Sequence, residues 1–324
     1  MKLTISGGFS MKLIKYFPGF FVFTLLILLI NGCRNPMGPQ PLEETPTRGN
    51  ISISVDESFQ LLLDTEIFTF QSLYPDAKIK ANYKPEADVL ADLMNDSVRT
   101  IVLTRDLTKA EKDLLFSQKF LARTTKVAHD AIALIVNRGN PDSLLLLGQL
   151  EDIFLGKIST WKQLNPLASS SPINIVFDNN KSGNVRYFQE KYSLKGSFPS
   201  NFFAVNSNND VLNYVQKTPG AIGIISVNWI SDNEDSVSNR FLKSIRVVAV
   251  GNEKSSCSKP YQGYIADGSY PLCRDVFIIS RETFAGLGTG FASFVAGDQG
   301  QRIILKSGLV PATMPIRLIN VKKD

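Results

Sequence analysis

The chain has 324 residues, 44% of them hydrophobic, with 35 basic residues, 30 acidic residues and a single histidine. The lysines and arginines are scattered without a basic run, so we expect no nucleic-acid partner. One histidine and no Cys-x-x-Cys pair argue against a structural zinc site, and we expect neither a metal nor a cofactor.

The first 32 residues have the pattern of an export signal. Three lysines precede an apolar run from Phe20 to Ile30, and the first acidic residue is Glu43. The run is shorter than the roughly 20 apolar residues that a membrane-spanning helix needs. We therefore predict a signal peptide over residues 1–32 that is removed after export. A translation start at Met11 instead of Met1 leaves this prediction unchanged.

Cys33 follows the apolar run directly. Ile30-Asn31-Gly32-Cys33 resembles a lipobox, which predicts lipid attachment at Cys33 and a membrane anchor. The alternative is an ordinary secretory signal with a chance cysteine. Residues 33–49 contain four prolines and two glycines, as a flexible tether does. Without the signal's lysines the net charge falls from +5 to about +2, so charge indicates no particular partner.

From residue 50 onward strand and helix signals alternate, which is typical of an α/β fold with largely parallel sheets. Apolar and polar residues alternate over 51–55, whereas apolar residues recur at helical spacing over 59–73. The expected strands are 51–55, 78–83, 100–104, 130–137, 173–177, 221–226, 246–250 and 275–280. The expected helices are 59–73, 85–95, one from Thr108, 146–154, one from Ser182, 210–216, 289–295 and 297–307.

Three loops pass from an expected strand into a helix: 54–59, 104–108 and 180–184. In open α/β sheets ligands bind beyond the carboxyl ends of strands, where helix N-termini offer free N–H groups and partial positive charge. These loops are therefore candidate anion sites.

The loop at Ser182-Gly183-Asn184 has the most informative sequence. It places a hydroxyl, a residue without a side chain and an amide at the first turn of a helix, and Arg186 lies one turn further on. Gly183 lets an anion approach the backbone, and Arg186 can add charged hydrogen bonds. The alternative is that Ser182 is a simple N-cap.

Arg105 follows a buried strand, so its guanidinium is expected at the carboxyl edge of the sheet, where it suits a tetrahedral oxyanion. The alternative is a surface salt bridge with Asp106. Asp56 and Glu57 precede another helix, where acidic residues are favoured without any ligand. An anion bound beside them has to carry a proton. His129-Asp130 lacks a nucleophile motif, and we expect no enzyme.

Four segments together resemble the PstS-like substrate-binding proteins of phosphate ABC importers. They are Asp130–Asn137 with Asn140-Pro141 after it, Gln149–Trp161 with its L-x-x-I-F-x-G-K-I-x-x-W pattern, Pro219–Ile225, and Tyr270–Arg274. Their order and spacing carry the resemblance, which extends from about Asn50 to Leu318.

The resemblance implies a two-lobed type II periplasmic-binding-protein fold, with two mixed or parallel sheets flanked by helices and hinge closure on an oxyanion. The crossing strands are then 130–137 and 272–280. Lobe I comprises residues 50–128 plus 276–324, and lobe II comprises 129–275. The ligand-binding residues expected from the loops and the resemblance are Ser58, Thr104, Arg105, Ser182, Gly183, Asn184 and Arg186.

Three positions depart from the family pattern. Asp178 stands where many phosphate binders of this group carry an arginine, Thr104 replaces an aspartate, and Asn184 replaces a threonine. Arg105 is expected to restore the charge that is missing at position 178. Which oxyanion binds is therefore open.

The sequence predicts a monomeric solute-binding lipoprotein that captures phosphate, or a related oxyanion, for an ABC importer. The alternatives are a ligand-free interaction or sensory protein on the same fold and a secreted phosphatase. Cys257 and Cys273 could form a disulfide or remain two thiols.

Overall fold

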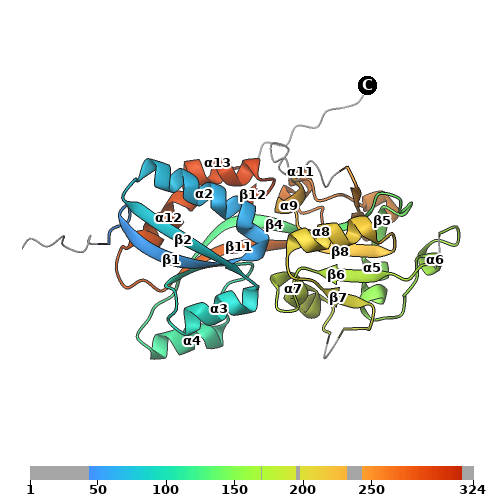
Figure 1. Cartoon of the computed structure of the whole chain (residues 1–324), viewed down its shortest axis with the longest axis horizontal. Helices are drawn as coiled ribbons and strands as arrows, with labels where there is room; N and C mark the ends of the chain where they lie inside the picture. The colour runs from blue at the N-terminus through green and yellow to red at the C-terminus, as the bar shows by residue number, and fades with distance from the viewer. Residues whose placement is uncertain (1–43, 169, 195–197, 232–242, 316–324) are drawn as a thin grey trace, which may run out of the picture. The chain divides into compact units, whose positions relative to one another are not determined.

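The computed structural model describes residues 44–168, 170–194, 198–231 and 243–315, and has the predicted α/β fold (Figure 1). The predicted signal peptide, the lipidation site Cys33 and the tether up to residue 43 lie outside the described residues. Within the described part, no helix is long and apolar enough to cross a membrane.

One half of the main sheet contains β1 (Gly49–Asp56), β2 (Ala77–Lys84), β3 (Thr100–Leu103) and β11 (Cys273–Ser280). β1 pairs in parallel with β2 and β3, and β11 is antiparallel to β3. In Figure 1, α2, α12 and α13 lie on one side of these strands, and α3 and α4 on the other. These helices are α2 (Gln60–Leu73), which follows the 3-10 turn η1 (Glu57–Phe59), α3 (Glu86–Met94), α4 (Lys109–Ser117), α12 (Leu287–Ala296) and α13 (Asp298–Lys306). We call this part the first half.

The second half contains β6 (Asn174–Phe177), β7 (Phe202–Ala204), β8 (Ala221–Ser226) and β9 (Ile245–Val247). β6 is parallel to both β7 and β8. α8 (Asn208–Lys217) packs on β8 and β6, and α7 (Gly183–Lys191) contacts β8. The remaining elements are β5 (Leu144–Leu146), α5 (Leu147–Phe154), α6 (Trp161–Leu164), α9 (Asn228–Ser231), β10 (Ala249–Gly251), η2 (Lys254–Ser256), α11 (Gln262–Ala266) and β12 (Val310–Pro311).

β4 (Arg123–Asn137) joins the two halves, as predicted for a crossing strand. Its first part pairs with β11 and its last part with β8 and β9, so one strand contributes to both cores. Residues 131–136 of β4 are fully buried because they are apolar on both faces. β11, the other predicted crossing strand, pairs within the described residues only with β3 and β4, and its Cys273 lies opposite Ala131.

The last residues of the predicted tether belong to the folded domain instead. Glu44 forms a salt bridge with Arg99 at 2.5 Å, and its other carboxylate oxygen accepts a hydrogen bond from the Leu287 backbone N–H at 3.1 Å. The proline and glycine content of 33–49 hid this contact, because Glu44 binds residues that are far away in the sequence. The tether as predicted therefore extends too far.

Cys257 and Cys273 are both free thiols, which answers the question that the sequence left open. Each Sγ contacts a nearby carbonyl instead, at 3.2 Å from Glu253 and 3.1 Å from Tyr270. The expected strand 246–250 is also divided, because β9 pairs with β4 whereas β10 pairs with β5.

Candidate functional site

Buried polar side chains gather where β4 passes from the first half of the sheet to the second. We call them the junction cluster. These side chains come from the loops after β1, β2, β3 and β6, from the segment between β8 and α9, and from the strands β4 and β11. The members of the cluster, all at most 7% exposed, are Asp56, Ser58, Glu86, Thr104, Asp130, Asp178, Ser182, Asn184, Asn228 and Arg274. Burying so many polar groups is costly unless they are paired with each other or with a ligand.

The loop after β1 supplies a free hydroxyl and a carboxyl group. One oxygen of Asp56 caps η1 by accepting a hydrogen bond from the Ser58 N–H at 2.9 Å. The other Asp56 oxygen and Ser58 Oγ form no hydrogen bond with any described residue. Burial, and next the nearby Glu86, raise the pKa of Asp56 to about 7. The Asp56 carboxyl can therefore carry a proton near neutral pH.

The loop after β6 behaves both as an N-cap and as part of the cluster. Ser182 Oγ caps α7 by accepting a hydrogen bond from the Val185 N–H at 3.3 Å. The Asn184 amide donates to Asp178 at 3.1 Å, which leaves the Asn184 oxygen without a described partner. Burial raises the pKa of Asp178, although hydrogen bonds from Ser182 and Asn184 oppose this.

At Gly183 the two halves lie too close together to leave room for a side chain. A Cβ atom at this position would lie 2.7 Å from Thr104 Oγ1, 2.8 Å from Glu86 Oε2 and 2.9 Å from the free oxygen of Asp56. All three atoms belong to the first half, whereas Gly183 opens α7 of the second. The absent side chain therefore permits the contact between the halves.

Glu86 takes up donors that the sequence assigned to a ligand. Its carboxylate accepts hydrogen bonds from the Thr104 N–H at 3.2 Å, from the Thr104 hydroxyl, and from Arg186 Nε and Nη2. Arg186 also bonds Thr104 at 2.9 Å and Glu190 at 2.7 Å. Burial raises the pKa of Glu86, but the hydrogen bonds and charge of Arg186, the Thr104 hydrogen bond and the charge of Arg274 together lower it below its usual range. The guanidinium of Arg186 and the hydroxyl and backbone N–H of Thr104 therefore already bind an anion of the protein itself, the Glu86 carboxylate.

Arg105, which was expected to bind the ligand, is paired with Glu111 in this structure. Both Nη atoms bind the Glu111 carboxylate, at 2.7 and 2.8 Å, and Nη1 also donates to the Asp106 carbonyl at 2.9 Å. The same carboxylate closes the capping box of α4 by accepting a hydrogen bond from the Thr108 N–H at 2.7 Å. Arg105 is therefore fixed to the helix start, as part of a salt bridge with Glu111 rather than with Asp106.

Arg274 is the arginine that the structure places in the cluster. Its Nε donates to Asp130 at 2.9 Å, and Asp130 also accepts a hydrogen bond from Ser226 at 2.8 Å. The side chains of Arg274 and Asp130 are 3% and 0% exposed. Both Nη atoms of Arg274 form no hydrogen bond with any described residue.

Of the predicted ligand residues, Ser58, Thr104, Ser182, Gly183, Asn184 and Arg186 lie in or beside the junction cluster. Glu86 and Arg274 were missed. Glu86 could have been found, because it follows β2 at a fourth passage from strand to helix. Arg274 carried a weaker signal, a charged residue directly after Leu272-Cys273 on an expected crossing strand.

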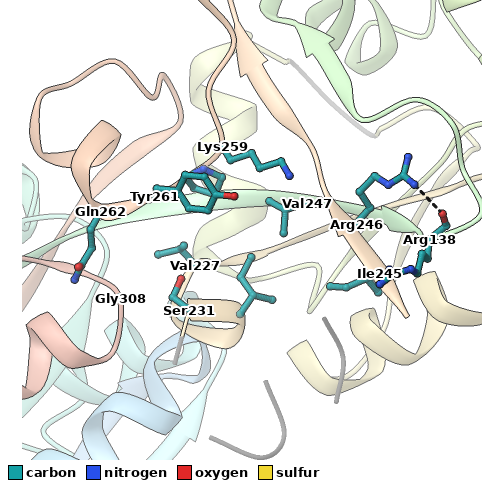
Figure 2. A pocket seen from close by; sticks show the side chains of 12 residues that line it. Arg138, Val227, Ser231, Ile245, Arg246, Val247, Lys259, Tyr261, Gln262 and Gly308 are labelled. Carbon is teal, nitrogen blue, oxygen red and sulfur yellow. Dashed lines mark hydrogen bonds between the residues drawn. The ribbon is translucent and has the colours of Figure 1, made fainter. Parts of the chain in front are cut away.

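A separate pocket of about 510 Å³ lies in the second half, beside α9 and β9 (Figure 2). Arg138, Arg246 and Lys259 contribute to its wall, and Arg246 donates to the Arg138 carbonyl at 3.3 Å. None of the predicted site residues lines it. The candidate site is therefore the junction cluster and not this pocket.

Solved structures of phosphate transport proteins have a similar architecture. A phosphate ABC transporter substrate-binding protein from Clostridium perfringens, solved with bound phosphate, is 25% identical, with a TM-score of 0.69 over 82% of this chain and 100% of that one. An ABC-type phosphate transport receptor from Vibrio cholerae has a TM-score of 0.62 at 23% identity over 82% of this chain and 100% of that one, which supports the fold. Both agree with the predicted type II fold.

The relatives found by sequence are phosphate-binding proteins as well. The phosphate-binding protein PstS of Bacillus subtilis is 24% identical over 83% of both chains, and that of Staphylococcus epidermidis strain RP62A is 27% identical over 61% of this chain. The chain spans 59% of the length of the staphylococcal relative. Both relatives are named as phosphate-binding proteins. Residues 41–299 match the family described as the PBP superfamily domain. The chain therefore belongs to the PBP superfamily, and its predicted resemblance to the PstS-like binding proteins is confirmed.

Proposed function

We propose that this protein captures phosphate, or a similar tetrahedral oxyanion, in the junction cluster and delivers it to an ABC importer. The observation that carries the proposal is the set of buried polar atoms without a described partner, on Ser58, Asn184 and Arg274. Such atoms are costly to bury unless a ligand satisfies them. The relatives named above are phosphate-binding proteins, which supports phosphate as the ligand.

The chemistry of the cluster favours an oxyanion that carries a proton. Guanidinium and hydroxyl groups, together with the N-terminus of α7, supply donors for the anionic oxygens. The Asp56 carboxyl has its pKa raised to about 7 by burial, and next by Glu86, so it can share a proton with a ligand oxygen. A fully ionised anion would have to lie beside this carboxyl and Asp178 without any shared proton.

The division into lobes follows from the same proposal. Residues 50–128 plus 276–324 form lobe I and residues 129–275 form lobe II, which open and close about the long strands. We further propose that residues 1–32 direct export and that a lipid on Cys33 keeps the mature monomer at the membrane, within reach of the importer.

A second candidate is a ligand-free interaction or sensory protein. It is favoured by the acidic side chains of the cluster, since Glu86 already occupies donors from Thr104 and Arg186. In that case hydrogen bonds and ion pairs between residues of the protein, such as Arg186 with Glu86, hold the two halves together without a ligand.

Isothermal titration of the purified protein with phosphate, sulfate and molybdate separates the two candidates. We expect saturable binding of phosphate, with one site per chain and weaker or no binding of sulfate, which carries no proton at neutral pH. A lack of heat with all three anions, together with unchanged melting temperatures, would refute the ligand-binding function and favour the second candidate.

A further inference from the structure

Arg105, Arg186 and Arg274 could each supply the positive charge that a bound oxyanion needs. The first two are already paired with carboxylates of the protein. Arg105 gives both Nη atoms to Glu111. Arg186 gives its donors to Glu86, Glu190 and Thr104. Both guanidinium groups are therefore already paired with carboxylates of the protein.

Arg274 is different because one edge of its guanidinium is held and the other is open. Nε is fixed by Asp130, whereas Nη1 and Nη2 are buried without a described hydrogen-bond partner. The plane also lies near the Phe59 ring, with the central carbon 5.8 Å from the ring centroid. A buried guanidinium with two unused donors is costly, and a bidentate oxyanion is the group that matches its geometry.

The electrostatics of the cluster point the same way. The positive charge of Arg274 acts on Asp56, Glu86 and Asp178, which come from three different loops of the cluster. Arg274 is therefore close enough to these three carboxyl groups to lower the pKa of each. Without this charge the carboxyl groups of the region would repel an anion more strongly.

We propose that Arg274 anchors the oxyanion through its two Nη atoms, and that Asp130 is the positioning residue that fixes the guanidinium. This inference rests on the proposed function. It means that the positive charge for the ligand comes from β11, at the junction of the two halves, and not from the loop at Asp178. Asp130 lies on β4, which both halves share, so the anchor stays in place while the halves move.

The test compares phosphate binding by titration calorimetry in the unchanged protein, Arg274→Gln, Arg274→Lys and a control, Arg302→Gln. Arg302 is an exposed arginine on α13, paired with Asp298. We expect Arg274→Gln to lose at least 100-fold in affinity. Arg274→Lys should lose about tenfold, because it keeps the charge but not the planar fork. The control should change less than twofold.

Affinity within threefold of the unchanged protein in folded Arg274→Gln would overturn the inference and leave the proposed function intact. If Arg274→Gln fails to fold, the pair Asp130→Asn with Arg274→Gln leaves no lone buried charge and replaces it in the test. Phosphate binding retained by this double variant would likewise overturn the inference. An unchanged protein that binds no phosphate would overturn the proposed function itself, and the inference with it.

Discussion

Gly183 offers a direct test of whether ligand capture requires the two halves to meet. Substitution Gly183→Ala adds one methyl group where three polar atoms of the first half lie 2.7 to 2.9 Å away. Contacts this short cannot persist, so the halves have to separate by several tenths of an ångström. Thr104 and Asp56 have short side chains in buried positions, and Glu86 is held by Arg186, so little local adjustment is available.

The size of the effect follows from the cost of overpacking. An extra methyl group in a packed site costs about 1–3 kcal/mol. If that cost falls on the closed state alone, phosphate affinity drops by roughly 5- to 150-fold. If the lobes open without ligand, as proposed above, the open state leaves room for the methyl group and the melting temperature without ligand should change little.

Titration calorimetry measures the change in phosphate affinity. Small-angle scattering with and without phosphate measures whether the two halves still close. The matched control is Gly148→Ala in α5, where a Cβ would meet nothing within 4 Å. We expect the control to bind as the unchanged protein does. Unaltered phosphate affinity in folded Gly183→Ala would refute this reasoning, and so would a loss in the control of the same size.

Two further predictions concern buried acids. Burial raises the pKa of Glu66 on α2 to about 9, and both carboxyl oxygens lack a described partner. The folded state keeps this proton up to about pH 9 whereas the unfolded chain loses it near pH 4.5, so stability falls as pH rises through that window. Glu66→Gln should therefore stabilise the protein by about 3 kcal/mol at pH 7 and by little at pH 4.5, in chemical denaturation; equal gains at both values would contradict this. Glu86→Gln removes a negative charge that raises the pKa of Asp56. Carboxyl NMR titration should then show the Asp56 pKa falling by about one to two units, and an unchanged Asp56 pKa would show that burial alone raises it.

Local sequence patterns predicted helices and strands well where a few neighbouring residues, such as an N-cap, determine where the helix begins. The capping box of Thr108 and Glu111 was correctly located, as was the helix that Ser182 caps. The first part of β4 was missed because residues 123–126 are polar and partly exposed, and their strand geometry depends on pairing with β11. Pairing with a segment about 150 residues away leaves no local signal.

The composition of the site was harder to predict for the same reason. A strand followed by a helix correctly marked the loops that reach the cluster. It could not show that Glu111 has spare acceptors for Arg105, or that Arg274 meets Asp130 from a neighbouring strand. These choices depend on which carboxylate lies within reach of each guanidinium in the folded chain.

The account depends most on whether an oxyanion binds in the junction cluster. A crystal structure of the protein grown with phosphate tests this most directly. We predict phosphate within hydrogen-bonding distance of both Nη atoms of Arg274 and of Ser58 Oγ, with the Asp56 carboxyl against a ligand oxygen. An empty cluster at saturating phosphate, or phosphate bound only elsewhere on the protein, would contradict the account.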